Sequence, residues 1–148
     1  MADVTLEIAG PERRETLANL FQLYTHDFSE QWAGRDDGEL QEDARFPPYV
    51  HLDSYWAEPD CTPYLIRADG HLAGFVLINA FSHSGLPIDH AVAEYFVVRK
   101  HRRGGVGRAA ARAAIAPRPG QWELAVARKN TAALPFWQAV AGELAAGP

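Results

Sequence analysis

Apolar and polar positions along the chain predict strands and helices in alternation. Residues 4–8 alternate between apolar and polar side chains, which is typical of a strand with one buried face. Gly10-Pro11 then precedes apolar residues at helical spacing, so we expect a helix whose apolar side packs in the core. The residues that carry this spacing are Leu17, Leu20, Phe21, Tyr24 and Phe28.

The rest of the pattern predicts a hairpin followed by further strands and helices. Asp69-Gly70 lies between two apolar stretches, 64–67 and 72–79, and favours a hairpin with a type I′ turn. Residues 29–60 are polar and rich in Gly, Pro and aromatics, as functional loops often are, with a short helix near 52–56. We further expect strands over 91–98 and 122–126 and helices over 106–115 and 131–140. The length favours one α/β domain over residues 1–148.

The most distinctive motif is a basic, glycine-rich turn at 102–108, between a predicted strand and a predicted helix. Gly105 and Gly107 have no Cβ, so their backbone can approach a ligand closely and adopt positive φ angles. The free N–H groups and the positive end of the helix dipole favour an anion there. Three arginines add full charges around the turn, namely Arg102, Arg103 and Arg108. We therefore expect a phosphorylated ligand.

The glycine spacing argues against two common nucleotide-binding loops. The chain has no Gly-x-x-x-x-Gly-Lys-Ser/Thr sequence, which argues against a nucleoside triphosphatase. Ala110 stands where the dinucleotide fingerprint requires its third glycine. The motif that remains is Arg102-x-x-Gly105-Val106-Gly107 after a strand. It resembles the acetyl-CoA-binding signature Gln/Arg-x-x-Gly-x-Gly/Ala of the GNAT N-acetyltransferase superfamily.

A second motif further along the chain supports the same resemblance. Asn130, Ala133 and Phe136 are in register with the superfamily pattern Asn-x-x-Ala-x-x-Φ-Tyr. The segment Leu52-Asp-Ser-Tyr-Trp56 and the hairpin after it resemble a bacterial subgroup of predicted acetyltransferases. The resemblance is sharp over roughly residues 91–140. It implies a GNAT-like acyl-CoA N-acyltransferase fold, a mixed central sheet flanked by helices.

The resemblance also implies acetyl-CoA as the cofactor and a set of residues that bind it. In the superfamily the pantetheine arm lies along the strand of the first motif and uses main-chain bonds, like an added strand. The expected cofactor-binding residues are Phe96, Val97, Val98, Arg102, Arg103, Gly104, Gly105, Val106, Gly107, Arg108, Asn130 and Phe136. Asn130 could equally cap the helix that begins after it. Arg112 is expected to be solvated surface.

Acyl transfer to an amine needs a neutral nucleophile, a polarised thioester carbonyl and a proton for the leaving thiolate. Glu94 is the candidate base, because it lies among apolar residues on the strand that the resemblance assigns to the cofactor. The alternative for Glu94 is a structural charge or ion-pair partner at the strand edge. A backbone N–H near Val97 would polarise the carbonyl.

The expected proton donor departs from the superfamily pattern. Trp137 stands where a tyrosine is common, and an indole N–H cannot act as a useful acid. Solvent or another side chain could protonate the thiolate instead, and the sequence does not choose among them. The alternatives are Tyr24, Tyr49, Tyr55 and His83. None of the six histidines has a metal-ligand spacing, so no metal is expected.

Charge is distributed unevenly along the chain. Residues 27–60 carry ten acidic side chains against two arginines, whereas residues 95–120 carry seven Lys/Arg and no acid. The basic stretch is short and the net charge is −5, which favours a small polyanion over nucleic acid. The acidic stretch would attract a small-molecule or peptide amine, with Tyr24, Asp27 and Tyr49 expected to bind this acceptor. The alternatives are a solvated loop face for the acids and core packing for the aromatics.

The remaining features of the sequence concern the cellular location of the protein and its oligomeric state. The one cysteine, Cys61, excludes an internal disulfide, and the chain has neither an apolar run of membrane-spanning length nor a leader-like N-terminus. We therefore expect a cytoplasmic enzyme with no membrane partner. The usual C-terminal strand of the superfamily is missing from the pattern, which would leave an exposed sheet edge. The two alternatives are a homodimer partner that covers this edge and a shortened chain that has lost activity.

These expectations point to an N-acetyltransferase that uses acetyl-CoA. A catalytically silent acyl-CoA-binding or sensing module is the second hypothesis, supported by Trp137 and the missing strand. A small nucleic-acid-binding protein is the third, and it rests only on the basic turn.

Overall fold

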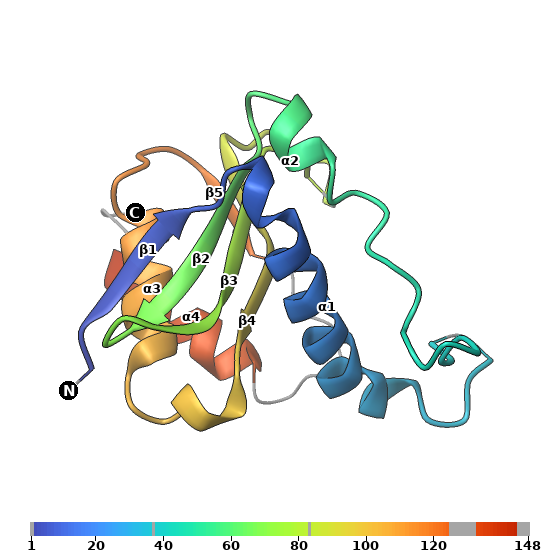
Figure 1. The fold of residues 1–148 in the computed structure, drawn as a ribbon. Helices are drawn as coiled ribbons and strands as arrows, with labels where there is room; N and C mark the ends of the chain where they lie inside the picture. Colours follow the sequence, from blue (N-terminus) through green and yellow to red (C-terminus); the bar gives the residue numbers. More distant parts are fainter. Residues whose placement is uncertain (1, 37, 83, 125–132, 145–148) are drawn as a thin grey trace.

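A computed structural model describes residues 2–36, 38–82, 84–124 and 133–144. A five-stranded sheet in the order β1-β2-β3-β4-β5 forms its centre, and helices lie on both faces (Figure 1). The strands are β1 (Val4–Ile8), β2 (Thr62–Ala68), β3 (His71–Asn79), β4 (His90–Val97) and β5 (Trp122–Leu124). The helices are α1 (Arg14–Ser29), α2 (Ser54–Ala57), α3 (Val106–Ile115) and α4 (Ala133–Leu144). Single 3-10 turns occupy Pro11–Arg13, Glu30–Trp32 and Arg99–His101.

The predicted elements are confirmed in type and order. The strand over 4–8 and the helix over 106–115 have the predicted bounds. Asp69 and Gly70 join β2 to β3 with φ angles of 51° and 82°, and two positive φ angles are what a type I′ turn requires. Parts of the last predicted strand and helix lie outside the described residues. The described part of the last helix continues to Leu144, beyond its predicted end.

The sheet is buried on both faces, so successive strand residues pack in two separate cores. The core on the side of α1 and α2 includes Leu17, Phe21, Tyr55, Leu65, Phe75, Leu77 and Phe96. The core on the side of α3 and α4 includes Ile66, Val76, Ile78, Val97, Val106, Ala110 and Val140. Burial on both faces explains why β3 and β4 are almost continuously apolar rather than alternating.

Strand β4 positions the site because its pairing changes along its length. Leu77 of β3 pairs with Glu94, but the next residue of β3 pairs with Val92, so β4 carries one extra residue as a β-bulge beside Glu94. On its other side β4 runs parallel to β5, and the described pairs cover only residues 90–92. From residue 93 onward, β4 borders a cleft rather than another described strand.

Candidate active site

Two clefts meet at Glu94. The first, which we call the β4–α3 cleft, has a volume of about 770 Å³ and lies between β4, the beginning of α3, the end of α1 and α4. The second, the α1 pocket, has a volume of about 480 Å³ and lies between α1 and the loop over 46–51. Tyr24, Phe28 and Glu94 line both clefts. A ligand in either cleft can therefore reach the carboxylate of Glu94.

Tyr24 holds this carboxylate from helix α1. Its hydroxyl donates a hydrogen bond to Glu94 Oε2 at 2.6 Å. Burial, and next the negative charge of Glu94, raise the pKa of Tyr24 far above its ordinary value. The phenol therefore stays protonated and remains a donor to Glu94. Its ring is packed against Phe75 and Phe96, with centroids 5.5 Å away in each case.

The other tyrosines considered as proton donors lie further from Glu94. Tyr49 lines the α1 pocket, and burial, then the charge of Glu94, raises its pKa to about 12. Tyr55 is buried and lines neither cleft, and its hydroxyl accepts a hydrogen bond from Asn79 Nδ2 at 3.2 Å. His83 lies outside the described residues.

The turn before α3 offers backbone donors to an anion. Gly105 precedes the helix with a φ of 78°, and no described side chain caps the first N–H groups of α3. A Cβ added at Gly104 or Gly105 would meet no described atom within 4 Å, so there is open space beside this backbone. Gly105, Gly107 and Arg108 line the β4–α3 cleft. The uncapped N-terminus of α3 thus faces a cleft as an anion site.

Gly107 is small for a different reason. A Cβ at this position would lie 2.9 Å from the hydroxyl oxygen of Tyr95, and this hydroxyl donates to the carbonyl oxygen of Gly107. The Tyr95 ring in turn contacts Phe136 and Trp137 of α4 at centroid distances of 5.9 and 5.0 Å. Tyr95 therefore connects β4 to both helices beside the cleft. It was not predicted from the sequence, where the only signal is a polar-tipped ring in an apolar strand.

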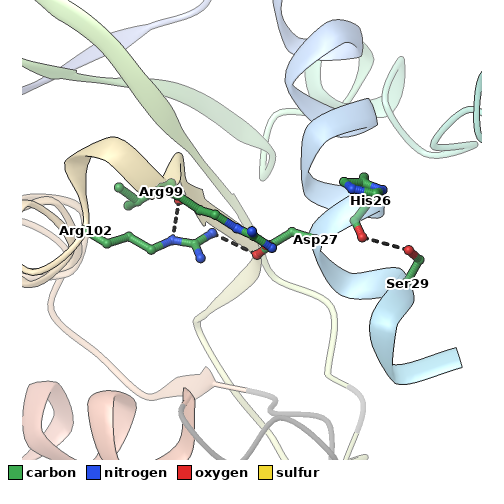
Figure 2. A network of polar contacts seen from close by, with 6 residues as sticks. His26, Asp27, Ser29, Arg99 and Arg102 are labelled. Atoms are coloured by element: carbon green, nitrogen blue, oxygen red, sulfur yellow. Dashed lines mark hydrogen bonds and ion pairs between the residues drawn. The ribbon is translucent and has the colours of Figure 1, made fainter. Parts of the chain in front are cut away.

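Asp27 joins α1 to the turn that follows β4. Arg99 donates to its Oδ1 at 2.6 Å and Arg102 to its Oδ2 at 2.8 Å, while Arg102 Nε also donates to the carbonyl oxygen of Val97 at 2.8 Å (Figure 2). Burial raises the pKa of Asp27, but the hydrogen bonds from Arg102 and Arg99 outweigh it and leave the pKa below its ordinary value. Asp27 lines the β4–α3 cleft and not the α1 pocket. Its charge is therefore compensated before any amine arrives.

The other arginines differ in how available they are to a ligand. Arg112 is exposed, as expected, and its solvated side chain also donates to Glu143 Oε1 of α4 at 2.7 Å. Arg108 lies 3.6 Å from the other oxygen of Glu143. Arg103 lines the β4–α3 cleft and makes no hydrogen bond or ion pair with another described residue. Among the predicted phosphate ligands, Arg103 is the most available cation.

The remaining predicted cofactor residues fall into two groups. Phe96, Val97 and Phe136 line the β4–α3 cleft together with Trp137. Val98 does not line it, and its N–H donates to the carbonyl oxygen of Ala73 at 2.8 Å. The side chain of Val106 is buried in the core, so only its backbone is available to a ligand. Asn130 lies outside the described residues.

The α1 pocket is less acidic than the charge of its loop suggests. Asp53, for example, bonds to Arg14 at 2.7 Å and lies outside the pocket. The described acids of residues 27–60 do not line the pocket, whose one described carboxylate is that of Glu94. Its wall is instead formed by aromatic rings and two prolines, Pro47 and Pro48. The described residues contain no group of three or more potential metal ligands.

Residues 17–142 match the family model described as Acetyltransferase (GNAT) family. The match spans four of the five strands, α2, α3 and most of α1 and α4, and so includes both sides of each cleft. The chain therefore belongs to the GNAT acetyltransferase family and is an acyltransferase. No curated protein matches the chain. No described helix is long and apolar enough to cross a bilayer.

Several solved structures share the fold. A mutant of the BH1408 protein of Bacillus halodurans is 16% identical with a TM-score of 0.68, covering 97% of this chain and 95% of that one. The ribosomal-protein-alanine N-acetyltransferase of Brucella melitensis biovar Abortus is 16% identical with a TM-score of 0.58, covering 99% and 94%. An aminoglycoside acetyltransferase from an uncultured soil metagenomic sample is 10% identical with a TM-score of 0.59, covering 93% and 86%. These likenesses establish the GNAT-like fold.

Proposed function

We propose that the protein transfers the acetyl group of acetyl-CoA to a primary amine. The observation that carries the proposal is the position of Glu94 where two clefts meet, one of them ending at an uncapped helix N-terminus. Membership of the GNAT acetyltransferase family supports acyl transfer as the reaction class. Two separate entrances to one carboxylate suit a reaction between two substrates.

The β4–α3 cleft fits the chemical groups of acetyl-CoA. The N–H groups at the beginning of α3 would hold the pyrophosphate, with Arg103 as an available cation in the same cleft. The edge of β4 from Glu94 to Val97 would hold the pantetheine arm through main-chain bonds. When bound, acetyl-CoA supplies the activated acetyl thioester.

Glu94 would act as the general base. Amines are mostly protonated at neutral pH, and a protonated nitrogen has no free lone pair. The carboxylate therefore removes one proton, which makes the nitrogen neutral and nucleophilic. Tyr24 would fix the carboxylate in place by its hydrogen bond. The neutral nitrogen then forms a bond to the carbonyl carbon as the carbon–sulfur bond breaks. The nitrogen loses a second proton as the amide forms and the thiolate gains one, while the proton taken up by Glu94 passes to solvent and restores the carboxylate.

Protonation of the thiolate would fall to solvent in the open cleft. Trp137 lines the β4–α3 cleft but offers no acid of useful strength. The raised pKa of Tyr24 makes its phenol a weak acid, and it already donates to Glu94. We therefore assign Tyr24 to positioning the base.

Calorimetry and a thiol-release assay together test the proposal. Acetyl-CoA should bind in the absence of amine, and a panel of primary amines should accelerate thiol release. Glu94→Gln should keep acetyl-CoA affinity while turnover falls by about a hundredfold or more. Tyr95→Phe removes a hydroxyl from the same strand edge without changing a carboxylate, so turnover at saturating acetyl-CoA should fall far less than in Glu94→Gln.

The second candidate is a silent acyl-CoA-binding or sensing module, and the position of Trp137 in the cleft favours it. A silent module would bind acetyl-CoA and release no thiol with any amine. Thiol release that depends on an amine and on Glu94 would exclude this candidate.

A further inference from the structure

The α1 pocket has a mostly apolar wall. Rings from α1 and from the following loop form most of it, with the two prolines closing one side. The wall residues are Phe21, Tyr24, Phe28, Trp32, Phe46, Pro47, Pro48 and Tyr49. Such a wall favours an apolar or aromatic ligand body, because burying that body removes apolar surface from water.

The wall is held in place by contacts between α1 and the loop. The side chain of Gln22 makes two hydrogen bonds to the backbone of Phe46, from its amide nitrogen to the carbonyl oxygen at 3.0 Å and from the Phe46 N–H to its amide oxygen at 2.7 Å. The ring of Tyr49 stacks on Phe21 at 4.5 Å with an interplanar angle of 9°. Both contacts fix the loop over 46–51 against α1, so the pocket is formed before a ligand arrives.

Trp32 is also closely packed in the wall of the pocket. A Cβ added at Gly38 would lie 2.2 Å from a ring carbon of Trp32, so the loop backbone lies directly on this indole. The indole in turn contacts Phe28, with 5.5 Å between ring centroids. Trp32 therefore forms a fixed part of the wall.

Among the described residues, one acidic side chain lines this pocket. Glu94 is the carboxylate that lines it among the described residues, and it lies at the junction with the β4–α3 cleft. The nearest acid on α1, Asp27, lies outside the pocket and binds Arg99 and Arg102. A ligand in the pocket therefore meets one carboxylate, that of Glu94, and a wall whose other described side chains include the imidazole of His51 but no further acid.

We propose that the α1 pocket selects a primary monoamine with an apolar, ring-containing body. This assignment rests on the proposed function, because it takes Glu94 as the group that receives the ammonium. The amino group points to Glu94 and the body lies against the aromatic wall, where the rings also attract a nearby cation. A second ammonium group on the same ligand would be desolvated without a counter-charge. Polyamines and aminoglycosides are therefore disfavoured.

A matched pair of amines tests this proposal. Phenethylamine and cadaverine are primary amines of similar length, but cadaverine carries a second ammonium in place of the ring. We expect phenethylamine to have the higher kcat/KM by about tenfold or more. Hexylamine should lie between them, and kanamycin should be the poorest acceptor. Binding of the same amines to the protein loaded with CoA is measured by calorimetry in parallel.

Two variants test whether the pocket itself sets the preference. Thr25 lines the pocket on α1, so Thr25→Asp adds a second carboxylate to the wall, and Thr25→Asn is the uncharged control. Thr25→Asp should move the preference toward cadaverine by about tenfold, whereas Thr25→Asn should not. Trp32 lines the α1 pocket and not the β4–α3 cleft. Trp32→Ala should lower kcat/KM for phenethylamine about tenfold and leave the KM for acetyl-CoA unchanged.

The binding and transfer measurements separate the two proposals. If phenethylamine binds more tightly than cadaverine but neither is acetylated, the ligand class stands and the proposed function fails. If both are acetylated with equal or reversed preference, the proposed function stands and the ligand class is overturned. The class is also overturned if neither amine binds, or if Thr25→Asp leaves the preference unchanged in a folded protein.

Discussion

Removing the Tyr24 hydroxyl changes one hydrogen bond and little else. Tyr24→Phe keeps the ring contacts with Phe75 and Phe96 but deletes the donor to Glu94. A hydrogen bond to a charged group contributes about 1.5–3 kcal/mol. One pH unit corresponds to about 1.4 kcal/mol. The loss should therefore move the ionisation of the catalytic carboxylate by about one to two units.

The direction of the shift follows from which form the bond stabilises. The phenol donates to the carboxylate, so its loss favours the protonated form of Glu94, which is inactive as a base. The acidic limb of kcat/KM against pH should consequently move to higher pH in Tyr24→Phe. Activity well above this limb should stay close to that of the parent protein, because the base is then ionised in both.

The assay is the pH dependence of kcat/KM for the amine at saturating acetyl-CoA, with two comparison variants. Tyr95→Phe deletes a hydroxyl that bonds to Gly107 instead, so it should leave the acidic limb in place. Tyr49 also lies near Glu94, and Tyr49→Phe should shift the limb less than Tyr24→Phe. Glu94→Gln should abolish the limb. An unchanged limb in Tyr24→Phe, with the limb lost in Glu94→Gln, would refute the positioning role of Tyr24.

Further predictions concern the cleft and its supports. Asp27→Asn should lower Tm by about 2–6 °C at pH 7 through loss of the ion pairs with two arginines. Because the Asp27 pKa is lowered in the folded protein, this difference should be complete above the ordinary carboxyl pKa and be lost as the pH falls from there through the lowered pKa of the folded state. Gly105→Val should abolish acetyl-CoA binding measured by calorimetry, because a side chain would fill the open space and strain a φ of 78°. Gly107→Val should instead cost about 1–3 kcal/mol of unfolding free energy in denaturant titrations, because it collides with the Tyr95 hydroxyl. Arg103→Ala should weaken acetyl-CoA binding about tenfold without changing Tm, whereas Arg112→Ala should change the affinity far less; equal effects would contradict the assignment of Arg103.

Local signals explain the parts of the fold that could be predicted from the sequence. The helix over 106–115 is bounded by Gly105 and by Pro117, and both residue types punctuate helices for steric reasons. Asp69-Gly70 predicts the turn between β2 and β3 equally well, because few residue pairs tolerate two positive φ angles. Glu94 was identifiable as a candidate because a charge in an apolar strand is unusual.

Contacts between distant residues could not be predicted in this way. Tyr24 and Glu94 are 70 positions apart, and Asp27 is 72 positions from Arg99. No periodicity or motif relates such residues, and only the packing of α1 against the sheet brings them together. The acidic charge of residues 27–60 could be read from the sequence, but the composition of this segment does not show which side chains line the α1 pocket. Pro47 and its aromatic neighbours line it, and the described acids of the loop do not.

The most direct test of the account is to follow the acetyl group itself. Carbon-labelled acetyl-CoA is incubated with the protein and phenethylamine, and the product is identified by NMR and mass spectrometry. The labelled N-acetyl amide and free CoA should form in equal amounts, and Glu94→Gln should form far less of both although it binds acetyl-CoA equally well. Binding of acetyl-CoA without amide formation by any primary amine of the panel, or amide formation unaffected by Glu94→Gln, would contradict the proposed mechanism.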